Sequence, residues 1–371
     1  MSTLEAVLRG LSAFAHRGSA RPEEFAAAQW LRGELEARGL AVRVQPFNSP
    51  DTYSWDVAGS AGLLGLGALA AAGNPLLGAL LALGGASWFH AHFSGLPHPL
   101  EALVPRRPSQ NLVAHFGTGP REVVLMAHYD SARSALLYAP GRVDGFRRSF
   151  VTNAALAYLT PLLAALAALA PDLRFVLLFL GLYFLANAAL FVLRERREPI
   201  VNGANDNASG VAAAVEVALR LRARGHGRVT LLLTGCEEVG ARGAAAYAAT
   251  LEANADTLVL NLDNVGAGAL HLARGEGMLG YSPYRPEGLE AARTALQDRL
   301  PELEYRLAYF DTRPFARRGL PCLSLIALEG GRIPNWHWPS DTLERVDVAA
   351  VTRAADAAEA IALQWLGAEP K

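Results

Sequence analysis

Acidic and histidine side chains follow directly after three apolar runs of this sequence. His128 and Asp130 close the run VVLMAHYD, Glu237 and Glu238 come shortly after VTLLLTG, and Asp263 closes LVLNLD. A hydrolytic two-metal site needs histidine and carboxylate ligands, with one carboxylate bridging ions about 3.5–4 Å apart, and a further carboxylate that accepts a proton from water. These residue types therefore indicate metal-assisted hydrolysis.

Two further candidates lie outside the apolar runs. Asp206 lies in GANDNASG, just before a helical segment, and His337 lies in the proline-containing segment NWHWPSD. The adjacent Glu237 and Glu238 are informative, because neighbouring carboxylates repel each other unless a cation or different roles separate them. We therefore expect one of the two glutamates to bind metal and the other to act on water.

The elements that must position these residues alternate between strands and helices. Apolar patterning predicts strands at 41–47, 121–130, 228–235, 257–266 and 322–328. It predicts helices at 21–39, 210–225, 240–251, 286–300 and about 347–366. Such alternation favours an α/β fold with a mostly parallel or mixed central sheet covered by helices. In open α/β sheets the functional crevice lies at the carboxyl ends of the strands, which is where most of the candidates fall.

Two long apolar segments interrupt the alternation. Residues 57–100 contain no Asp, Glu, Lys or Arg, and residues 149–193 contain only Asp172 and Arg174. A central turn divides each segment into two pieces that are long enough, at about 17–25 residues, to span a bilayer. The alternative is a set of buried helices or an apolar lid, but the many small residues favour close packing in lipid.

We therefore predict one α/β domain assembled from three stretches of chain, with two inserted transmembrane hairpins. The domain would comprise residues 1–56, 101–148 and 194–371, and the hairpins residues 57–100 and 149–193. Each hairpin returns the chain to the side from which it left, so the three stretches can meet on one side of the membrane.

The composition supports contact with lipid and argues against a nucleic-acid partner. Hydrophobic residues make up 51% of the chain and charged residues 19%, against a usual quarter, so lipid is expected to cover some apolar surface. A net charge of -1 and the absence of a basic run interleaved with aromatics argue against a nucleic-acid partner. Cys236 and Cys322 lie in apolar runs and are expected to be buried thiols and not a disulfide.

The candidate residues lie in five short motifs that follow one another in a family-specific order. In AHYDS, GANDNASG, GCEEVG, NLDNVG and HWPSDT the sequence resembles the di-zinc aminopeptidase superfamily, which also contains glutamate carboxypeptidases, transferrin-receptor-like ectodomains and glutaminyl cyclases. The resemblance covers nearly the whole chain apart from the two apolar insertions. It implies the zinc exopeptidase fold and a site for two Zn²⁺ ions.

The resemblance also implies a role for each motif residue. The implied ligands are His128 and Asp263 for one ion, Glu238 and His337 for the other, and Asp206 as the bridge between them. Asp130 would orient His128, and Glu237 would be the general base. A non-proline cis peptide would follow Asp206, and Gly210 would permit close packing of the next helix.

The sequence departs from the family pattern in two places. The segment FDTRPFARRGLP resembles the family's substrate-side segment, but Phe310-Asp311-Thr312 stands where Ser-Asp-His is usual, which leaves Asp311 as the substrate-binding candidate. The second apolar insertion lies between the first histidine ligand and the bridging aspartate. We therefore expect its helices beside the metal site, and hydrophobic or membrane-delivered substrates.

The expected activity is hydrolysis of a peptide or other amide bond near a free terminus, with an aminopeptidase as the leading form. A carboxypeptidase or an N-acyl amino acid hydrolase would use the same ions. A glutaminyl cyclase-like acyltransferase is a further alternative, although five ligands favour two metals and the cyclases work with one. An inactive receptor-like scaffold would have lost ligands or the base, and this sequence has lost none.

The orientation of the hairpins follows from their flanking charges. The arginines on the α/β side of the spans are Arg106, Arg107, Arg142, Arg147, Arg148, Arg194, Arg196 and Arg197. The opposite side has only Arg174, beside Asp172, and an uncharged turn at 73–75. The positive-inside rule therefore predicts an integral protein of the cytoplasmic membrane whose α/β domain faces the cytoplasm.

Overall fold

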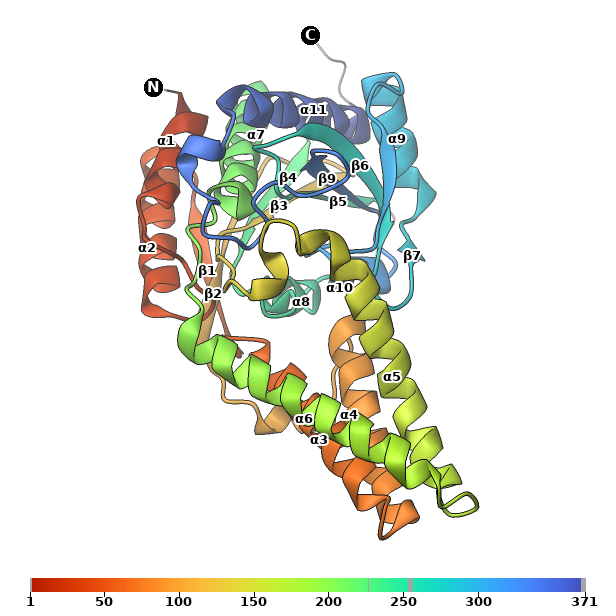
Figure 1. The fold of residues 1–371 in the computed structure, drawn as a ribbon. Coiled ribbons are helices and arrows are strands. Elements are labelled where there is room, and N and C mark those ends of the chain that lie inside the picture. The colour runs from red at the N-terminus through yellow and green to blue at the C-terminus, as the bar shows by residue number, and fades with distance from the viewer. Residues whose placement is uncertain (1, 226, 253–255, 368–371) are drawn as a thin grey trace.

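A mixed nine-stranded sheet forms the centre of the molecule in the computed structural model, which describes residues 2–225, 227–252 and 256–367 (Figure 1). Its strands are β1 (Val42–Ser49), β2 (Arg107–Phe116), β3 (Glu122–His128), β4 (Arg228–Thr234), β5 (Thr257–Leu262), β6 (Ala269–Glu276), β7 (Ser282–Pro283), β8 (Glu302–Tyr305) and β9 (Cys322–Leu328). Their order is β1-β2-β4-β3-β5-β9-β6-β7, with β8 beside β6. The α/β fold with a mixed central sheet agrees with the sequence.

The four central strands are parallel to one another, and the sheet turns antiparallel on either side of them. β4, β3, β5 and β9 run in one direction, whereas β1, β2 and β4 pair antiparallel in succession and β6 pairs antiparallel with β9 and β7. The five predicted strands are β1, β3, β4, β5 and β9. The carboxyl ends of the parallel strands therefore meet at one edge of the sheet, where the chemistry was expected.

Helices cover both faces of the sheet. They are α1 (Thr3–Ser12), α2 (Pro22–Ala37), α7 (Gly210–Arg224), α8 (Arg242–Ala248), α9 (Pro286–Leu296), α10 (Arg313–Arg317) and α11 (Val348–Leu366). Along β3, Val123, Leu125 and Ala127 belong to the core under α1, α2, α7 and α11, whereas Val124 and Met126 belong to the core under α8 and α10. Burial on both faces explains why the central strands are continuously apolar.

Four long helices project from one end of this α/β body (Figure 1). They are α3 (Ser54–Ala70), α4 (Pro75–Ser94), α5 (Phe146–Leu166) and α6 (Leu173–Arg197). The turn between α3 and α4 is set by Asn74, whose side chain accepts a hydrogen bond from the N–H of Leu77 at 3.1 Å. A Cβ atom at Gly67 would lie 2.4 Å from the backbone nitrogen of Ala82, so glycine is what lets these two helices approach.

Three helical segments are long and apolar enough to cross a membrane by length and composition: Pro75–Ser94, Val143–Leu166 and Leu173–Arg197. The sequence predicted four spans, but α3 has 17 residues and would reach only about 25 Å at 1.5 Å per residue. The outward faces of the other three carry exposed large apolar side chains, among them Leu80, Leu162, Phe175 and Phe179. Apolar surface of this extent indicates contact with something other than water.

Candidate metal centre

The candidate ligands converge from five separate segments of the chain. His128 is the last residue of β3, Asp263 directly follows β5, and Glu238 lies four residues after β4. Asp206 lies in the turn before α7, and His337 lies in the loop after β9. The structure brings all five predicted ligands to the carboxyl edge of the parallel strands.

Asp206 lies between the two histidines. Its Oδ1 atom is 3.3 Å from Nε2 of His128, and its Oδ2 atom is 3.2 Å from Nε2 of His337. His128 Nε2 is also 3.7 Å from Oδ1 of Asp263, and His337 Nε2 is 3.1 Å from Oε2 of Glu238. The ligand atoms therefore form two three-residue groups, each within 4.8 Å, and Asp206 belongs to both.

Glu237 points into the same space without being tied to another side chain. Its carboxylate forms a further group with His128 and Glu238, and it receives no hydrogen bond from the residues that the structure describes. Burial raises its pKa well above the usual range, opposed by the charge of His128 and reinforced by the charges of Asp311 and Glu238. A carboxylate of raised basicity that lines the cavity is suited to accept a proton.

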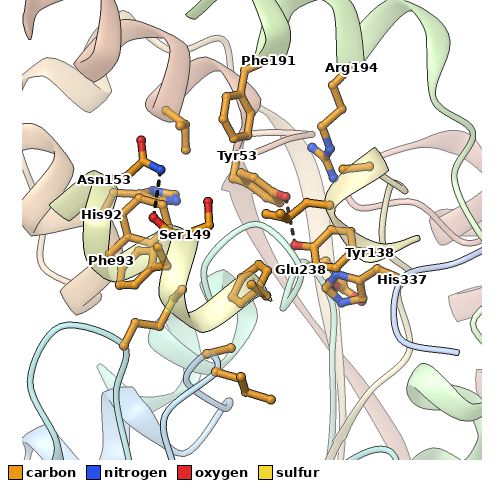
Figure 2. Close-up of a pocket in the computed structure, with 18 of the residues that line it drawn as sticks. Tyr53, His92, Phe93, Tyr138, Ser149, Asn153, Phe191, Arg194, Glu238 and His337 are labelled. Atoms are coloured by element: carbon orange, nitrogen blue, oxygen red, sulfur yellow. Dashed lines mark hydrogen bonds and ion pairs between the residues drawn. The ribbon is translucent and has the colours of Figure 1, made fainter. Parts of the chain in front are cut away.

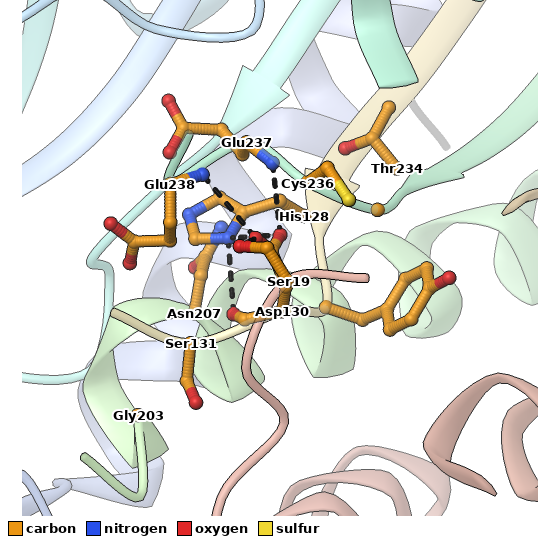
Figure 3. Close-up of polar contacts among 12 residues, drawn as sticks. Ser19, His128, Asp130, Ser131, Gly203, Asn207, Thr234, Cys236, Glu237 and Glu238 are labelled. Atoms are coloured by element: carbon orange, nitrogen blue, oxygen red, sulfur yellow. Dashed lines mark hydrogen bonds and ion pairs between the residues drawn. The ribbon is translucent and has the colours of Figure 1, made fainter. Parts of the chain in front are cut away.

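Asp130 holds the first histidine and both glutamates in one network (Figure 3). Its carboxylate accepts hydrogen bonds from Ser19 Oγ at 2.6 Å and from the backbone N–H groups of Glu237 and Glu238 at 3.1 and 3.3 Å. Its Oδ1 atom lies 3.5 Å from Nδ1 of His128. Asp130 is thus placed to orient the imidazole, which is the position that the resemblance implied.

The position of Asp206 is fixed by residues on either side of it. Asp341, in the motif HWPSDT, accepts hydrogen bonds from the backbone N–H groups of Asn205 and Asp206 at 2.7 and 3.0 Å. The expected cis peptide is present between Asp206 and Asn207. A Cβ atom at Gly210 would lie 2.2 Å from the carbonyl oxygen of Leu262, so the expected close helix packing is confirmed as well.

Sequence reasoning missed several residues that support the centre, of which Arg17 is the most extensively bonded. This fully buried side chain donates hydrogen bonds to the backbone oxygens of Tyr129, Asn202 and Gly203, each at 2.7 Å. It joins the loop after β3 to the loop before Asp206. No local motif marked Arg17, because its acceptors are main-chain atoms that the sequence does not reveal.

The donor set fits zinc. Imidazole nitrogen and carboxylate oxygen are ordinary zinc ligands, and burying several carboxylates together is costly unless cations neutralise them. Glu238 Oε1 and His337 Nδ1 are buried without a hydrogen-bond partner among the described residues. Burial alone would raise the pKa of Asp206, but hydrogen bonds with His128 and His337 lower it, so this carboxylate stays ionised.

Asp311 occupies a different position from the other candidates. It is fully buried, accepts a hydrogen bond from Thr234 Oγ1, and does not line the cavity that contains the candidate ligands. Burial raises its pKa to about 7, with the positive charge of His128 opposing the shift. Its role as a substrate-binding residue stays a prediction.

A cavity of about 690 Å³ joins the metal centre to the four long helices (Figure 2). At one end it is lined by His128, Asp206, Glu237, Glu238, Asp263 and His337. At the other end it is lined by side chains from α3, α4, α5 and α6, among them Leu64, Phe89, Phe93, Phe150, Phe184 and Phe191. The inserted helices therefore form a large part of the wall of the site, as expected from the position of the second insertion.

Comparison with known proteins supports a peptidase-type zinc site. Residues 191–362 match the family model described as Peptidase family M28. A search of curated proteins finds no match.

Solved structures show the same fold. An aminopeptidase from Aneurinibacillus sp. strain AM-1 matches with a TM-score of 0.60 and 18% identity, covering 100% of this chain and 96% of that one. A glutaminyl cyclase from Tannerella forsythia matches with a TM-score of 0.58 and 16% identity over 99% and 98% of the two chains. A zinc aminopeptidase from Bacillus subtilis matches with a TM-score of 0.57 and 17% identity over 97% and 94%. Residues 191–362 thus form an M28 peptidase domain, and the chain as a whole has the fold of these zinc aminopeptidases and glutaminyl cyclases, in agreement with the superfamily that its motifs resemble.

Proposed function

We propose that this protein is a two-zinc exopeptidase that hydrolyses an amide bond next to a free terminus. The observation that carries the proposal is the position of Asp206, whose two carboxylate oxygens face different histidines at 3.3 and 3.2 Å. A carboxylate in that position can bridge two cations. When bound, the ions would polarise the amide carbonyl and make a water molecule acidic.

In this proposal the proton is carried by Glu237. Its carboxylate would take a proton from the attacking water and return it to the nitrogen of the leaving amine, so that the amide yields an acid and an amine. Asp130 would hold His128 and the backbone of Glu237 in place during the reaction, through the contacts described above. The relatives point to an aminopeptidase as the first activity to assay.

The inserted helices suggest where the substrate comes from. Apolar side chains from α3 to α6 line the far end of the cavity, and the outward faces of the same helices are apolar. We infer that the helices lie in the cytoplasmic membrane, with the α/β domain on the cytoplasmic side, and that hydrophobic substrates reach the site from the bilayer. A carboxy-terminal reporter active only outside the cytoplasm would contradict the orientation.

The activity can be tested on detergent-solubilised protein with a panel of amides. The panel would contain leucine p-nitroanilide, an N-acyl leucine, an apolar tetrapeptide and a peptide with amino-terminal glutamine. We expect hydrolysis of at least one amide, its loss after treatment with a chelator, and its return when Zn²⁺ is added. Cyclisation of the glutaminyl peptide without hydrolysis of any amide would contradict the proposal.

A further inference from the structure

Arg194 is a buried cation in the wall of the cavity. It lies in the last turn of α6, is 6% exposed, and is the arginine that Figure 2 shows beside Tyr53 and Tyr138. Its Nε atom donates to the carbonyl oxygen of Ser134 at 2.9 Å, Nη1 donates to Ser54 Oγ at 2.8 Å, and Nη2 donates to the carbonyl oxygen of Arg133. All three acceptors are neutral.

The charge of Arg194 has no counter-ion in the part of the chain that the structure describes. The nearest carboxylate along the chain, Glu195, is engaged by Arg133 at 2.9 Å and by Arg21 at 3.3 Å. A guanidinium group has five N–H donors, so the three hydrogen bonds leave one free N–H on each terminal nitrogen. Leaving a buried guanidinium unpaired is costly, and the site therefore favours an anion.

A purely structural role does not account for this arrangement. A cation in the last turn of a helix is stabilised by the helix dipole, and the hydrogen bonds of Arg194 fasten α6 to residues 133–134. A lysine could interact with the helix dipole equally well, and a neutral donor could make the hydrogen bonds to residues 133–134. Neither purpose explains why the guanidinium faces a cavity with its charge uncompensated.

Two tyrosines connect the guanidinium to the metal centre. The Cζ atom of Arg194 lies 4.4 Å from the centre of the Tyr53 ring, and the Tyr53 and Tyr138 hydroxyl oxygens are 3.3 Å apart. The Tyr138 ring lies 4.7 Å from the His337 ring. In Figure 2 the three side chains follow one another along the cavity wall towards His337 and Glu238, with His92, Phe93 and Asn153 on the other side of the opening.

We propose that Arg194 receives the free carboxylate of the substrate, while an apolar acyl chain fills the helix-lined part of the cavity. The substrate class is an amide of an amino acid with a free α-carboxylate: an N-acyl amino acid, or the carboxyl terminus of an apolar peptide. This rests on the proposed two-zinc hydrolysis and selects one form of it. A free ammonium group in the same place would be repelled by Arg194.

The reaction balances without a further reagent. The oxygen of water adds to the acyl carbon, and the carbon–nitrogen bond breaks. The proton that Glu237 took from water goes to the amino nitrogen. The products are a carboxylic acid that carries the apolar chain and an amino acid whose carboxylate stays paired with Arg194 until release.

The test compares a pair of substrates that differ only in the charge of the terminal group with two further substrates, using zinc-loaded protein in detergent. The substrates are N-dodecanoyl-leucine, N-dodecanoyl-leucine amide, Ala-Ala-Ala-Leu and leucine p-nitroanilide. The variants are Arg194→Gln, Arg194→Lys and the control Arg196→Gln, which removes the same charge from an exposed position in the same helical turn that does not line the cavity. Comparing the hydrolysis of N-dodecanoyl-leucine with that of Ala-Ala-Ala-Leu shows whether the substrate is a lipid-like amide or the carboxyl terminus of a peptide.

We expect the wild type to prefer the free carboxylate to the carboxamide by at least about tenfold in kcat/KM. Arg194→Gln should raise KM for the carboxylate by about 10- to 100-fold, which is the range for a hydrogen bond to a charged group, and leave kcat/KM for the carboxamide unchanged. Arg194→Lys should restore part of the preference, and Arg196→Gln should match the wild type. N-dodecanoyl-leucine should also raise the melting temperature of the wild type more than that of Arg194→Gln.

Three results would overturn the inference. Equal hydrolysis of carboxylate and carboxamide by the wild type would show that no carboxylate is recognised. Equal loss of both activities in Arg194→Gln would make the residue structural. Hydrolysis of leucine p-nitroanilide alone would refute the carboxylate subsite and leave the two-zinc hydrolase intact, whereas hydrolysis of no amide would refute the proposed function itself.

Discussion

The two ends of the cavity are built in different ways. At the metal end, side chains come from the ends of strands and from tight loops, and main-chain or side-chain hydrogen bonds hold them in place. Asp130 alone accepts three hydrogen bonds, and Asp341 accepts two. Side chains held by such hydrogen bonds keep their geometry when no substrate is bound.

The helical end relies on apolar packing and has few polar crosslinks. Phe89, Phe93 and Phe150 pack with ring centres 4.7–6.0 Å apart. Between α5 and α6, Tyr183 Oη donates a hydrogen bond to Asn153 Oδ1 at 2.8 Å. This difference indicates that the sheet edge would determine the chemistry, whereas the inserted helices would determine which substrate binds. Changes at the two ends should therefore have separable effects.

The largest effect is expected at the base. Glu237→Gln should lower kcat by about 10²- to 10⁴-fold, because general base catalysis contributes that much, while the zinc content and melting temperature stay unchanged. Steady-state kinetics and metal analysis of the purified variant check this. If the variant loses zinc, Glu237 is a ligand and the roles of the two glutamates are exchanged.

A smaller effect on zinc binding and activity is expected at Asp130, which contacts the candidate ligand His128. Asp130→Asn should weaken zinc binding or activity by about 10- to 100-fold, because it removes the charge that orients His128. The measurement is a zinc titration against a competing chelator. Asp298→Asn, an exposed change outside the cavity, serves as the control, and equal zinc affinity in the two variants would remove Asp130 from the supporting network.

At the helical end the effect should depend on the length of the substrate. Leu190 on α6 lines the cavity and is 60% exposed, so Leu190→Ala should leave the fold intact. It should raise KM several-fold for a long-chain amide and leave an acetyl amide unaffected, because each buried methylene contributes about 0.8 kcal/mol. Leu182→Ala, on the same helix but outside the cavity, is the matched control. An equal loss with both amides would show that the helices act on the fold and not on the substrate.

The least effect on activity is expected at Glu276, the buried last residue of β6. Burial raises its pKa to about 7, against hydrogen bonds from the N–H of Phe310 and from Thr312 and Tyr284. The folded protein therefore keeps a proton on Glu276 that the unfolded chain, with a pKa of 4.5, releases. Its stability contribution is present below pH 4.5 and is lost as the pH rises to about 7, by an amount of about 3 kcal/mol.

Glu276→Gln should abolish this part of the pH dependence. Denaturant unfolding between pH 4.5 and 8 measures it, and the free energy of unfolding of the variant should fall less over that interval than that of the wild type. Identical slopes would show that Glu276 is ionised in the folded protein. Activity near pH 7 should change little, because Glu276 itself does not line the cavity.

The sequence predicted the elements whose patterns are local. Continuous apolar runs marked β3, β4, β5 and β9, and the residues directly after them marked most of the ligands. The strand β2 was missed because RPSQNLVAHF begins with polar residues and its pattern does not stand out. The short strands β7 and β8 were missed because two and four residues are too few to show a period.

The supporting residues could not be predicted from single positions. Ser19 contacts Asp130 across 111 residues of sequence, and Arg17 contacts Gly203 across 186, so only the fold brings them together. Arg194 was noted in the sequence for its position beside an apolar span. Its burial depends on the contact of α6 with residues 133–134, which no local pattern specifies.

The most direct test of the central claim is the zinc content of the purified protein, measured in parallel for the wild type and Asp206→Asn. A carboxylate that bridges two ions predicts about two equivalents of zinc in the wild type. It predicts a loss from both sites in Asp206→Asn, because a neutral amide bridges two cations poorly. One equivalent or none in the wild type, or full occupancy and activity in Asp206→Asn, would contradict a two-zinc centre built around Asp206.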